Sequence, residues 1–557
     1  MSASYSNFHE YFGLPSSTKV GSLIDFLRGK EVAGARNRTI DLDNDGVDEV
    51  WRLGDIIHST PAVVATPKDN YNRLYGDTTY ESFVDQYIDR RQVVYVGSND
   101  GMIHAFNGGF WDAANKEFKT TATGKTTRPL GQEMWAYVPS NLLPHMRWLA
   151  EPDYQHVYFM DGEPIVFDAN VFPDDATHPD GWGTIMVMGM RFGGSPLKIT
   201  VDSQDVVMRS AYVLFDVTDP EQPPKLLGEV SAPELGFTLS QPVVVKNRAP
   251  STNGDWTSPS VNDWYLVLGS GPIGSNAITN AVSDQTARLF AIDLEVLVDN
   301  AGTASPTGSS YFTTIGGGNL LDLGGGNGFV AGMEAVDWDR NGNEDAVYIG
   351  TIEGASASPS GRMHRLLIDD NDGSVQVYNG LGSAVLSEFV NPGLPIQAAP
   401  TTVRDSLGER WLLFGTGKLL VPGDNSLIQQ EYFYGVKEPR GTDGDLTYAS
   451  VAPGNLIDTT DVAVFEESGE VKDISSGSAA TLSIGGNAVT TFDGLEKTLR
   501  DYPGWKIQMS NPSGVASGRV TNSATLNPAD RKSFGFTEYL PPAQSCELDG
   551  ESFLYAL

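Results

Sequence analysis

Short apolar runs separated by Gly, Asn and Asp residues follow one another along most of this chain. The run at 93–96 leads into a polar stretch at 97–101 and then into a second apolar run at 102–106. Two such runs joined by an Asn-Asp-Gly turn are typical of an antiparallel β-hairpin. The same order returns along the chain, with residues 164–169 after 156–162, 211–216 after 182–190, 288–293 after 264–269, 363–369 after 347–350 and 432–436 after 411–415. The pattern predicts an all-β protein.

The recurrence of one hairpin type predicts a β-propeller. In each unit a first strand ends in Gly and a second strand often ends in Asp, as at Gly269 and Asp293. Self-similar units of about four strands are typical of propeller blades. They recur at irregular intervals of roughly 40 to 80 residues, which insertions would explain. We therefore expect about seven irregular blades with inserted loops, and an array of β-sandwiches is the alternative.

Some segments depart from the strand pattern. A short helical pattern occupies residues 20–27, before the first hairpin. Residues 300–310 and 316–326 are rich in Gly, Ser, Thr and Asn, and residues 442–498 carry only weak strand signals. Sequences of this composition favour loops, so we expect irregular excursions in all three.

One loop between two strand-like runs has the spacing of a calcium site. With Asp337 as position 1, side chains that carry oxygen stand at positions 1, 3, 5 and 9, namely Asp337, Asp339, Asn341 and Asp345. Gly342 at position 6 permits a sharp turn, and Asn343 at position 7 can offer its backbone carbonyl. Because Ca²⁺ takes 6–8 oxygens at roughly 2.3–2.6 Å, this loop would supply most of its ligands.

This loop differs from an EF-hand. Position 12 is Tyr348 rather than the bidentate Glu, and the flanking residues have strand rather than helix periodicity. A solvated hairpin turn is the alternative, because Asp, Asn and Gly also favour turns. A turn needs only one or two such residues, so four ligands in register favour a strand-loop-strand calcium site.

A second candidate calcium loop lies near the start of the chain. Its potential ligands are Asp41, Asp43, Asp45, the backbone carbonyl of Val47, and Glu49. Together with the helical pattern, this loop would form an N-terminal segment, residues 1–50, that leads into the propeller, residues 51–557. A similar stretch at 369–373 fails in register, since Ile368 and Gln376 would stand at positions 1 and 9, so we interpret it as a hairpin turn.

Composition restricts the partners of this protein. Acidic residues number 71 against 37 basic ones, which gives a formal charge of −34. Such a chain cannot neutralise phosphates, so we expect no nucleic acid partner. The single cysteine, Cys546, excludes an intrachain disulfide or a cysteine-based zinc site. No apolar run is long enough to span a membrane, and no signal peptide opens the sequence, so we expect it to begin inside a longer protein.

Signals for catalysis are weak. No His-Glu-x-x-His motif occurs among the seven histidines. Residues 415–418 resemble half of a phosphate-binding loop, but Leu419 stands where Mg²⁺ binding needs Ser or Thr. We therefore predict that the protein is not an enzyme. The alternative is a dehydrogenase with a quinone cofactor, since such enzymes are also propellers with calcium. Such an enzyme would hold Ca²⁺ centrally with dispersed ligands, whereas here the ligands all lie in one loop.

Several longer motifs resemble the PilY family of type IV pilus-associated proteins. They lie at residues 53–61, 91–106, 133–140, 215–220, 337–350 and 414–418. The resemblance implies a C-terminal β-propeller of a pilus-tip adhesin, exported to the outer surface of the bacterium. It also implies that Ca²⁺ regulates pilus extension against retraction, and that the protein supports twitching motility and surface attachment together with minor pilin components.

Three departures from the family pattern limit what the resemblance implies, and the first is that the partner of Cys546 is absent. Asn341 stands where many members have Asp, which lowers the charge of the loop. No Arg-Gly-Asp tripeptide occurs, so integrin binding is not implied and the surface ligand is unknown. The sequence thus predicts a calcium-binding propeller that acts by binding, with a module in which calcium only stiffens a hairpin as a further alternative.

Overall fold

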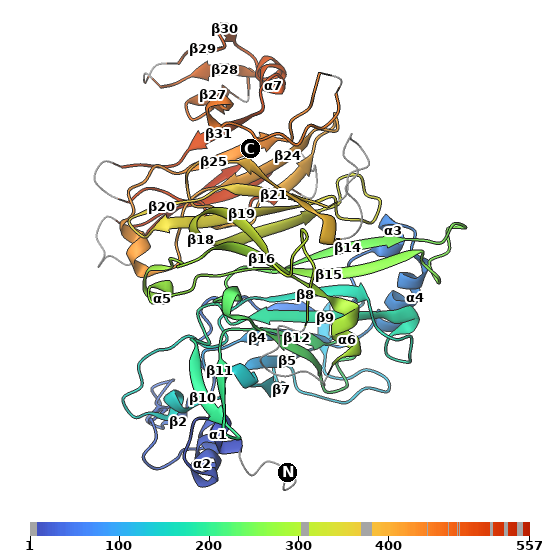
Figure 1. Cartoon of the computed structure of the whole chain (residues 1–557), viewed down its shortest axis with the longest axis vertical. Coiled ribbons are helices and arrows are strands. Elements are labelled where there is room, and N and C mark those ends of the chain that lie inside the picture. Colours follow the sequence, from blue (N-terminus) through green and yellow to red (C-terminus); the bar gives the residue numbers. More distant parts are fainter. Residues whose placement is uncertain are drawn as a thin grey trace. The chain divides into compact units, whose positions relative to one another are not determined.

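A computed structural model describes most of the chain. The described residues are 8–301, 311–368, 381–442, 444–465, 467–475, 477, 479–512, 516–527, 533–542 and 550–556. Their secondary structure is mainly antiparallel β-strand with a few short helices (Figure 1). Contacts divide the chain into one unit of Met1–Ser270 with Phe290–Thr313 and another of Gly271–Leu289 with Thr314–Leu557. The predicted boundary near residue 50 stays a prediction.

The first unit contains most of the helices. Its helices are α1 (Phe8–Tyr11), α2 (Ser17–Leu27), α3 (Tyr71–Leu74), α4 (Thr78–Tyr87), α6 (Leu294–Asp299) and the 3₁₀ turns η2 (Ser140–Leu142), η3 (Met146–Ala150), η4 (Pro179–Gly181) and η5 (Pro233–Leu235). Its strands are β1 (Thr39–Ile40), β2 (Glu49–Val50), β3 (Ala62–Val64), β4 (Gln92–Gly97), β5 (Ile103–Asp112), β6 (Glu117–Lys119), β7 (Glu133–Tyr137), β8 (Pro164–Asn170), β9 (Trp182–Gly189), β10 (Leu197–Val201), β11 (Gln204–Met208), β12 (Tyr212–Asp216), β13 (Lys225–Val230), β14 (Val243–Ala249), β15 (Val261–Gly269) and β17 (Phe312–Thr313). The predicted helix at 20–27 is confirmed as part of α2.

Two antiparallel sheets form successive blades in this unit. The first has five strands in the order β3-β4-β5-β6, with β7 also paired to β5, and the second has four strands in the order β13-β12-β9-β8. Strands β14 and β15 pair next. The apolar core beneath the first two blades includes Tyr95, Met146, Phe159 and Phe215.

The second unit repeats this arrangement. Its helical segments are α5 (Ala277–Asn280), α7 (Phe492–Arg500), η6 (Leu381–Ser383), η7 (Pro422–Ser426) and η8 (Pro453–Asn455), and β16 (Thr286–Asp293) crosses the boundary between the units. Its other strands are β18 (Leu321–Val336), β19 (Ala346–Ala355), β20 (Ser358–Ser360), β21 (Met363–Leu367), β22 (Val385–Val390), β23 (Thr401–Arg404), β24 (Arg410–Gly415), β25 (Tyr432–Lys437), β26 (Ile457–Asp458), β27 (Val462–Phe465), β28 (Glu470–Asp473), β29 (Ala480–Ile484), β30 (Asn487–Val489), β31 (Gly504–Gln508), β32 (Thr525–Leu526), β33 (Phe534–Leu540) and β34 (Glu551–Ala556). Two antiparallel blades have the orders β18-β19-β21-β22 and β23-β24-β25-β31.

These consecutive up-and-down sheets are the blades of a β-propeller, so the predicted fold class is confirmed. The number of blades stays a prediction. Of the predicted hairpins, the strands at 93–96 and 102–106 are confirmed as β4 and β5. The segment at 156–160 is not a strand, so that prediction was wrong. Its buried Phe159 and Met160 pack into the core without pairing in a sheet.

Two predicted excursions are more ordered than expected. Residues 442–498 include the small sheet β27-β28-β29-β30, which packs with α7 over its own apolar cluster of Val471, Leu482 and Leu495 (Figure 1). Residues 316–326 include the start of β18, where Gly324 and Gly325 have positive φ. The register shift between β16 and β18 accommodates these glycines inside a strand.

The strand-end glycines of the sequence pattern have a packing role. Added Cβ atoms would lie 2.4 Å from the carbonyl oxygen of Met160 at Gly97 and 2.2 Å from Cβ of Val520 at Gly415. In both cases the contacted segment comes from a later part of the same unit. Glycine therefore recurs where a strand end touches the chain of another blade.

Candidate metal centre

The loop at 337–345 closes the hairpin between β18 and β19. Val336 at the end of β18 pairs with Ala346 at the start of β19. The backbone N–H of Asp345 donates to the carbonyl of Val336 at 2.8 Å, and the carbonyl of Asp345 accepts from the N–H of Ile368 at 2.8 Å. The backbone at position 9 is thus held on both sides within a blade.

The first half of the loop folds around its own side chains. The two carboxylate oxygens of Asp337 accept from the N–H groups of Asn341 at 3.1 Å and Gly342 at 2.9 Å. Asp339 also accepts from the Asn341 N–H at 3.0 Å. Arg340 and Gly342 have φ values of 61° and 98°, which turn the chain sharply. These bonds wrap the backbone around the carboxylates of positions 1 and 3. At position 5 the amide nitrogen of Asn341 donates to Asp339 at 3.1 Å, and its side-chain oxygen accepts from the N–H of Asn343 at 2.8 Å.

Three carboxylates meet in this loop. One oxygen each from Asp337, Asp339 and Asp345 lies within 4.8 Å of the others. The side chain of Asp345 is buried, with 1% of the residue exposed. Its Oδ2 atom accepts a hydrogen bond from the N–H of Trp338. Its Oδ1 atom is buried and accepts no hydrogen bond. A buried carboxylate oxygen without a donor is costly, and a cation beside it would remove that cost.

Burial raises the pKa of Asp345 to about 8. The Trp338 N–H opposes this shift, the negative charge of Asp339 adds to it, Arg410 opposes it, and Asp337 adds to it. Without a cation the site therefore favours a protonated Asp345 near neutral pH. A divalent cation would favour the ionised carboxylate instead.

Sequence reasoning missed two arginines that surround this loop. The guanidinium of Arg404 donates to the carbonyl of Trp338 at 2.9 Å, and Arg410 lies 5.7 Å from the centre of the Trp338 ring. Both come from the next blade, on β23 and β24. Their distance along the chain explains why no local pattern identified them.

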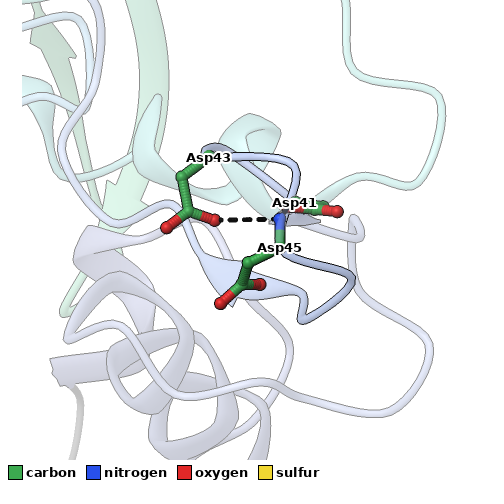
Figure 2. A group of neighbouring side chains, drawn as sticks. All are labelled: Asp41, Asp43 and Asp45. Atoms are coloured by element: carbon green, nitrogen blue, oxygen red, sulfur yellow. Dashed lines mark hydrogen bonds between the residues drawn. The ribbon is translucent and has the colours of Figure 1, made fainter.

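The loop at 41–49 has the same backbone geometry. Asp41 accepts from the N–H groups of Asp45 at 3.1 Å and Gly46 at 3.0 Å, and Asp43 accepts from Asp45 at 3.3 Å. Asn44 and Gly46 have φ values of 58° and 88°, close to those of Arg340 and Gly342. Figure 2 shows Asp41, Asp43 and Asp45 gathered at the loop, and an oxygen of each lies within 4.8 Å of the others.

The two loops differ at position 9. In the loop at 41–49, Glu49 is exposed and already lies in β2, where it pairs with Ile40 of β1. Val47, whose carbonyl was predicted as a ligand, is 59% exposed. The three clustered carboxylates are Asp41, Asp43 and Asp45, without Glu49. This loop therefore gathers three of its predicted side chains at a solvated position.

The remaining motifs have structural roles or lie outside the described residues. Lys418 is buried, donates to the carbonyl of Asn280 at 2.7 Å and lies 3.1 Å from Asp424, so it is already satisfied by the protein. The predicted turn at 369–373 and Cys546 both lie outside the described residues. Among the residues that the structure covers, no helix has both the length and the apolar character needed to cross a membrane.

Comparisons with known proteins agree on one family. The profile of the PilY1 beta-propeller domain matches residues 53–462. A type IV pilus biogenesis factor PilY1 homolog of Xylella fastidiosa is 25% identical over 515 residues, which cover 91% of this chain and 32% of the relative. The type IV pilus biogenesis factor PilY1 of Pseudomonas aeruginosa is 30% identical over 290 residues, which cover 50% of this chain and 19% of the relative. The chain thus spans about a third or less of these relatives.

A solved structure has the same fold. The crystal structure of the Pseudomonas aeruginosa PilY1 C-terminal domain aligns with a TM-score of 0.51 and 19% identity, covering 89% of this chain and 85% of that one. At this identity the likeness concerns the fold alone.

Proposed function

This chain belongs to the PilY1 β-propeller family, and we propose that it is a calcium-binding, non-catalytic propeller that acts in type IV pilus biogenesis. Its relatives are named as biogenesis factors of that pilus. In this proposal the propeller lies on the outer surface of the cell with minor pilin components. It influences the balance between pilus extension and retraction. Through that balance it affects twitching motility and surface adhesion.

The observation that carries the calcium proposal is the environment of Asp345. Its Oδ1 atom is buried without a hydrogen bond and belongs to a group of three carboxylates. We infer that Ca²⁺ is held by the side chains of Asp337, Asp339, Asn341 and Asp345 and by the carbonyl of Asn343. An oxygen-only set suits a hard cation such as Ca²⁺.

The loop at 41–49 supports a second, weaker calcium site in the same proposal. Asp41, Asp43 and Asp45 would contribute side chains, Val47 its carbonyl, and Glu49 the last ligand. Glu49 would have to turn toward the other three, since it is not clustered with them. Water would occupy more of the coordination shell here, which lowers affinity relative to a site with a pre-placed buried ligand.

The link between calcium and the pilus would be electrostatic. Without the ion, the negative charges of Asp337 and Asp339 repel one another and favour the protonated form of the buried Asp345, and the loop is destabilised. With the ion, the loop closes and presents one fixed surface. A pilus component that binds only the closed form would then sense calcium.

Calorimetric titration with Ca²⁺ tests the metal sites. We expect Asp345→Ala to abolish the tighter binding event and Asp45→Ala to abolish the weaker one. Asp405→Asn is a matched control, because Asp405 accepts from the N–H groups of Leu407 and Glu409 and from the Trp411 ring nitrogen, all within the protein. Unchanged stoichiometry in Asp345→Ala would contradict the proposed site.

The role in the pilus is tested in the full-length gene. Asp345→Ala and Asp345→Lys are scored for surface pili and twitching, with Asp405→Asn as control. The Lys ammonium can replace part of the cation's charge, so we expect the two variants to differ. If calcium binding is lost but both variants behave as wild type, the ion only stiffens a hairpin.

A further inference from the structure

A cavity in the first unit has a lining unlike the rest of this acidic chain. It measures about 640 Å³ and lies between the end of α2, the β1–β2 ribbon and the turn that follows β4. Three arginines, Arg36, Arg38 and Arg52, line it. Its volume falls in the usual range of ligand sites. Three guanidinium groups around one cavity are unexpected in a chain whose formal charge is −34.

The arginines are held in place by aromatic rings and backbone groups. The guanidinium of Arg36 lies 4.3 Å from the ring centre of Tyr154, and that of Arg38 lies 3.7 Å from the ring centre of Phe26. Arg38 also donates to the carbonyl of Lys30 at 3.1 Å, and its side chain is only 9% exposed. These contacts fix both guanidinium planes without neutralising their charge.

Arg52 is accommodated by a glycine. A Cβ atom at Gly29 would lie 2.6 Å from Cδ of Arg52, and Gly29 has a φ of 86°. The Arg52 Nε donates to the carbonyl of Gly29 at 3.4 Å. Any larger residue at position 29 would displace this side chain from the cavity wall.

The positive charge of the cavity is only partly compensated. Arg38 lies 3.4 Å from Glu31, but within the described part of the chain neither Arg36 nor Arg52 forms an ion pair. The Nε atoms of Arg36 and Arg38 are buried and donate no hydrogen bond.

The carboxylates of the cavity are already engaged elsewhere. Asp55 accepts from the side chain of Asn99 at 3.2 Å and contacts the ring of His156 at 2.8 Å. Asp100 accepts from the N–H of Gly54 at 3.1 Å and contacts His104 at 3.1 Å. They are therefore positioned by their own partners rather than by the three arginines.

The rest of the wall is apolar. It is formed by Leu27, Leu42, Trp51, Leu53, Met102 and Leu149. Leu42 and Trp51 are 49% and 51% exposed, although large apolar side chains are usually covered. Guanidinium groups next to such a wall suit a ligand with a negative end and an apolar body.

We propose that this cavity binds a carboxylate attached to an apolar body, with the carboxylate on Arg36, Arg38 and Arg52 and the body against Leu42 and Trp51. A planar carboxylate can accept paired hydrogen bonds from a guanidinium. The chain end of a peptide with an apolar last residue and a small organic acid both have this chemistry. The site goes beyond the proposed calcium function and requires no metal.

Calorimetry with two pairs of probes tests this site in the protein. One pair is 4-phenylbutyrate and 4-phenylbutanamide, and the other is a synthetic hexapeptide ending in Leu-Phe with a free or an amidated C-terminus. We expect at least one acid to bind saturably in the millimolar range or tighter, and its amide to bind about tenfold more weakly or worse. Binding by the peptide acid alone identifies a chain end as the source, and binding by the small acid alone identifies an organic acid.

Charge variants locate the binding. Arg36→Gln and Arg52→Gln should each weaken the binding of the acid about tenfold, whereas Arg73→Gln, which removes an exposed arginine of α3, should leave it unchanged. Arg38→Lys keeps the positive charge but removes the paired donors of the guanidinium, so it should weaken binding. The thermal midpoint of this variant verifies that it is folded. Equal binding of acid and amide, no saturable binding of either acid, or no effect of Arg36→Gln and Arg52→Gln would overturn the proposal.

Discussion

Arg365 and Glu438 form an ion pair of 2.6 Å in which neither side chain is exposed. The same carboxylate accepts a hydrogen bond from the hydroxyl of Tyr348, and Arg365 also donates to Ser387 at 3.1 Å. The pair joins β21 to the residue that follows β25 within the second unit. Its charges are screened from water, so the loss of one partner leaves the other uncompensated.

We therefore expect Arg365→Met to lower the free energy of unfolding by about 3–5 kcal/mol. Adding Glu438→Gln to this variant should restore part of the loss, because no buried charge then remains. Urea unfolding measures both. The control is Arg500→Met, which breaks an exposed pair with Glu496 and should cost about 1 kcal/mol or less. A cost for Arg365→Met as small as that of the control would contradict the argument.

Gly97→Ala should destabilise the protein by about 1–3 kcal/mol or more, because the new methyl group would meet the carbonyl oxygen of Met160 at 2.4 Å. Gly21→Ala in α2 is the matched control, since nothing lies within 4 Å of its added Cβ. That change should stabilise the helix by up to about 1 kcal/mol. Thermal unfolding of the two variants should thus shift in opposite directions; a shift in the same direction would count against the packing role of Gly97.

The stability of the protein should fall between pH 6.5 and about 4 in part because of His364. Burial lowers the pKa of His364 to about 4, with Glu353 opposing and Arg362 adding to the shift. In this pH range the unfolded chain binds a proton that the folded chain does not, so acid favours unfolding. This histidine should contribute about 3 kcal/mol of that loss.

Unfolding of His364→Gln as a function of pH isolates this effect. The variant should lose less stability than the wild type on going from pH 7 to pH 4.5. Identical pH dependence in wild type and His364→Gln would show that the histidine does not carry the change.

Removal of calcium should loosen the loop at 337–345 but leave the propeller folded. The unit that contains the loop has an apolar core that includes Tyr348, Phe389 and Phe414, so its fold does not depend on a metal. Calcium at a hundredfold excess over its Kd should add about 2.7 kcal/mol to stability. Chelator should therefore lower the thermal midpoint while the β-type circular dichroism persists at room temperature. Loss of that signal on chelation would contradict this prediction.

The sequence predicted features that depend on local spacing. Short apolar runs joined by an Asn-Asp-Gly turn located β4 and β5, and the Asp and Gly spacing located both acidic loops in their turns. It could not predict which position-9 residue would be buried, because the burial of Asp345 depends on its surroundings in the folded unit and not on local spacing. It also could not predict the arginine cavity, since Arg36 and Arg52 come together with Tyr154 only in the folded unit.

The segment at 442–498 shows a related limit. Its strands are short and mixed with Gly and Ser, so each alone gives a weak signal. They are ordered by a shared cluster under α7 rather than by strong individual propensity. The opposite error occurs at 156–160, where a strong apolar run predicted a strand. These apolar residues instead enter the core from a bend.

The two acidic loops have the same backbone conformation but differ in how the residue at position 9 is anchored. Asp345 is held within a blade, whereas Glu49 belongs to a two-residue ribbon at the surface. If both bind calcium, release from the loop at 337–345 requires part of a blade to open, while the loop at 41–49 exchanges with solvent freely. One chain would then carry a slow site that retains its ion through brief depletion and a fast site that follows the surrounding concentration.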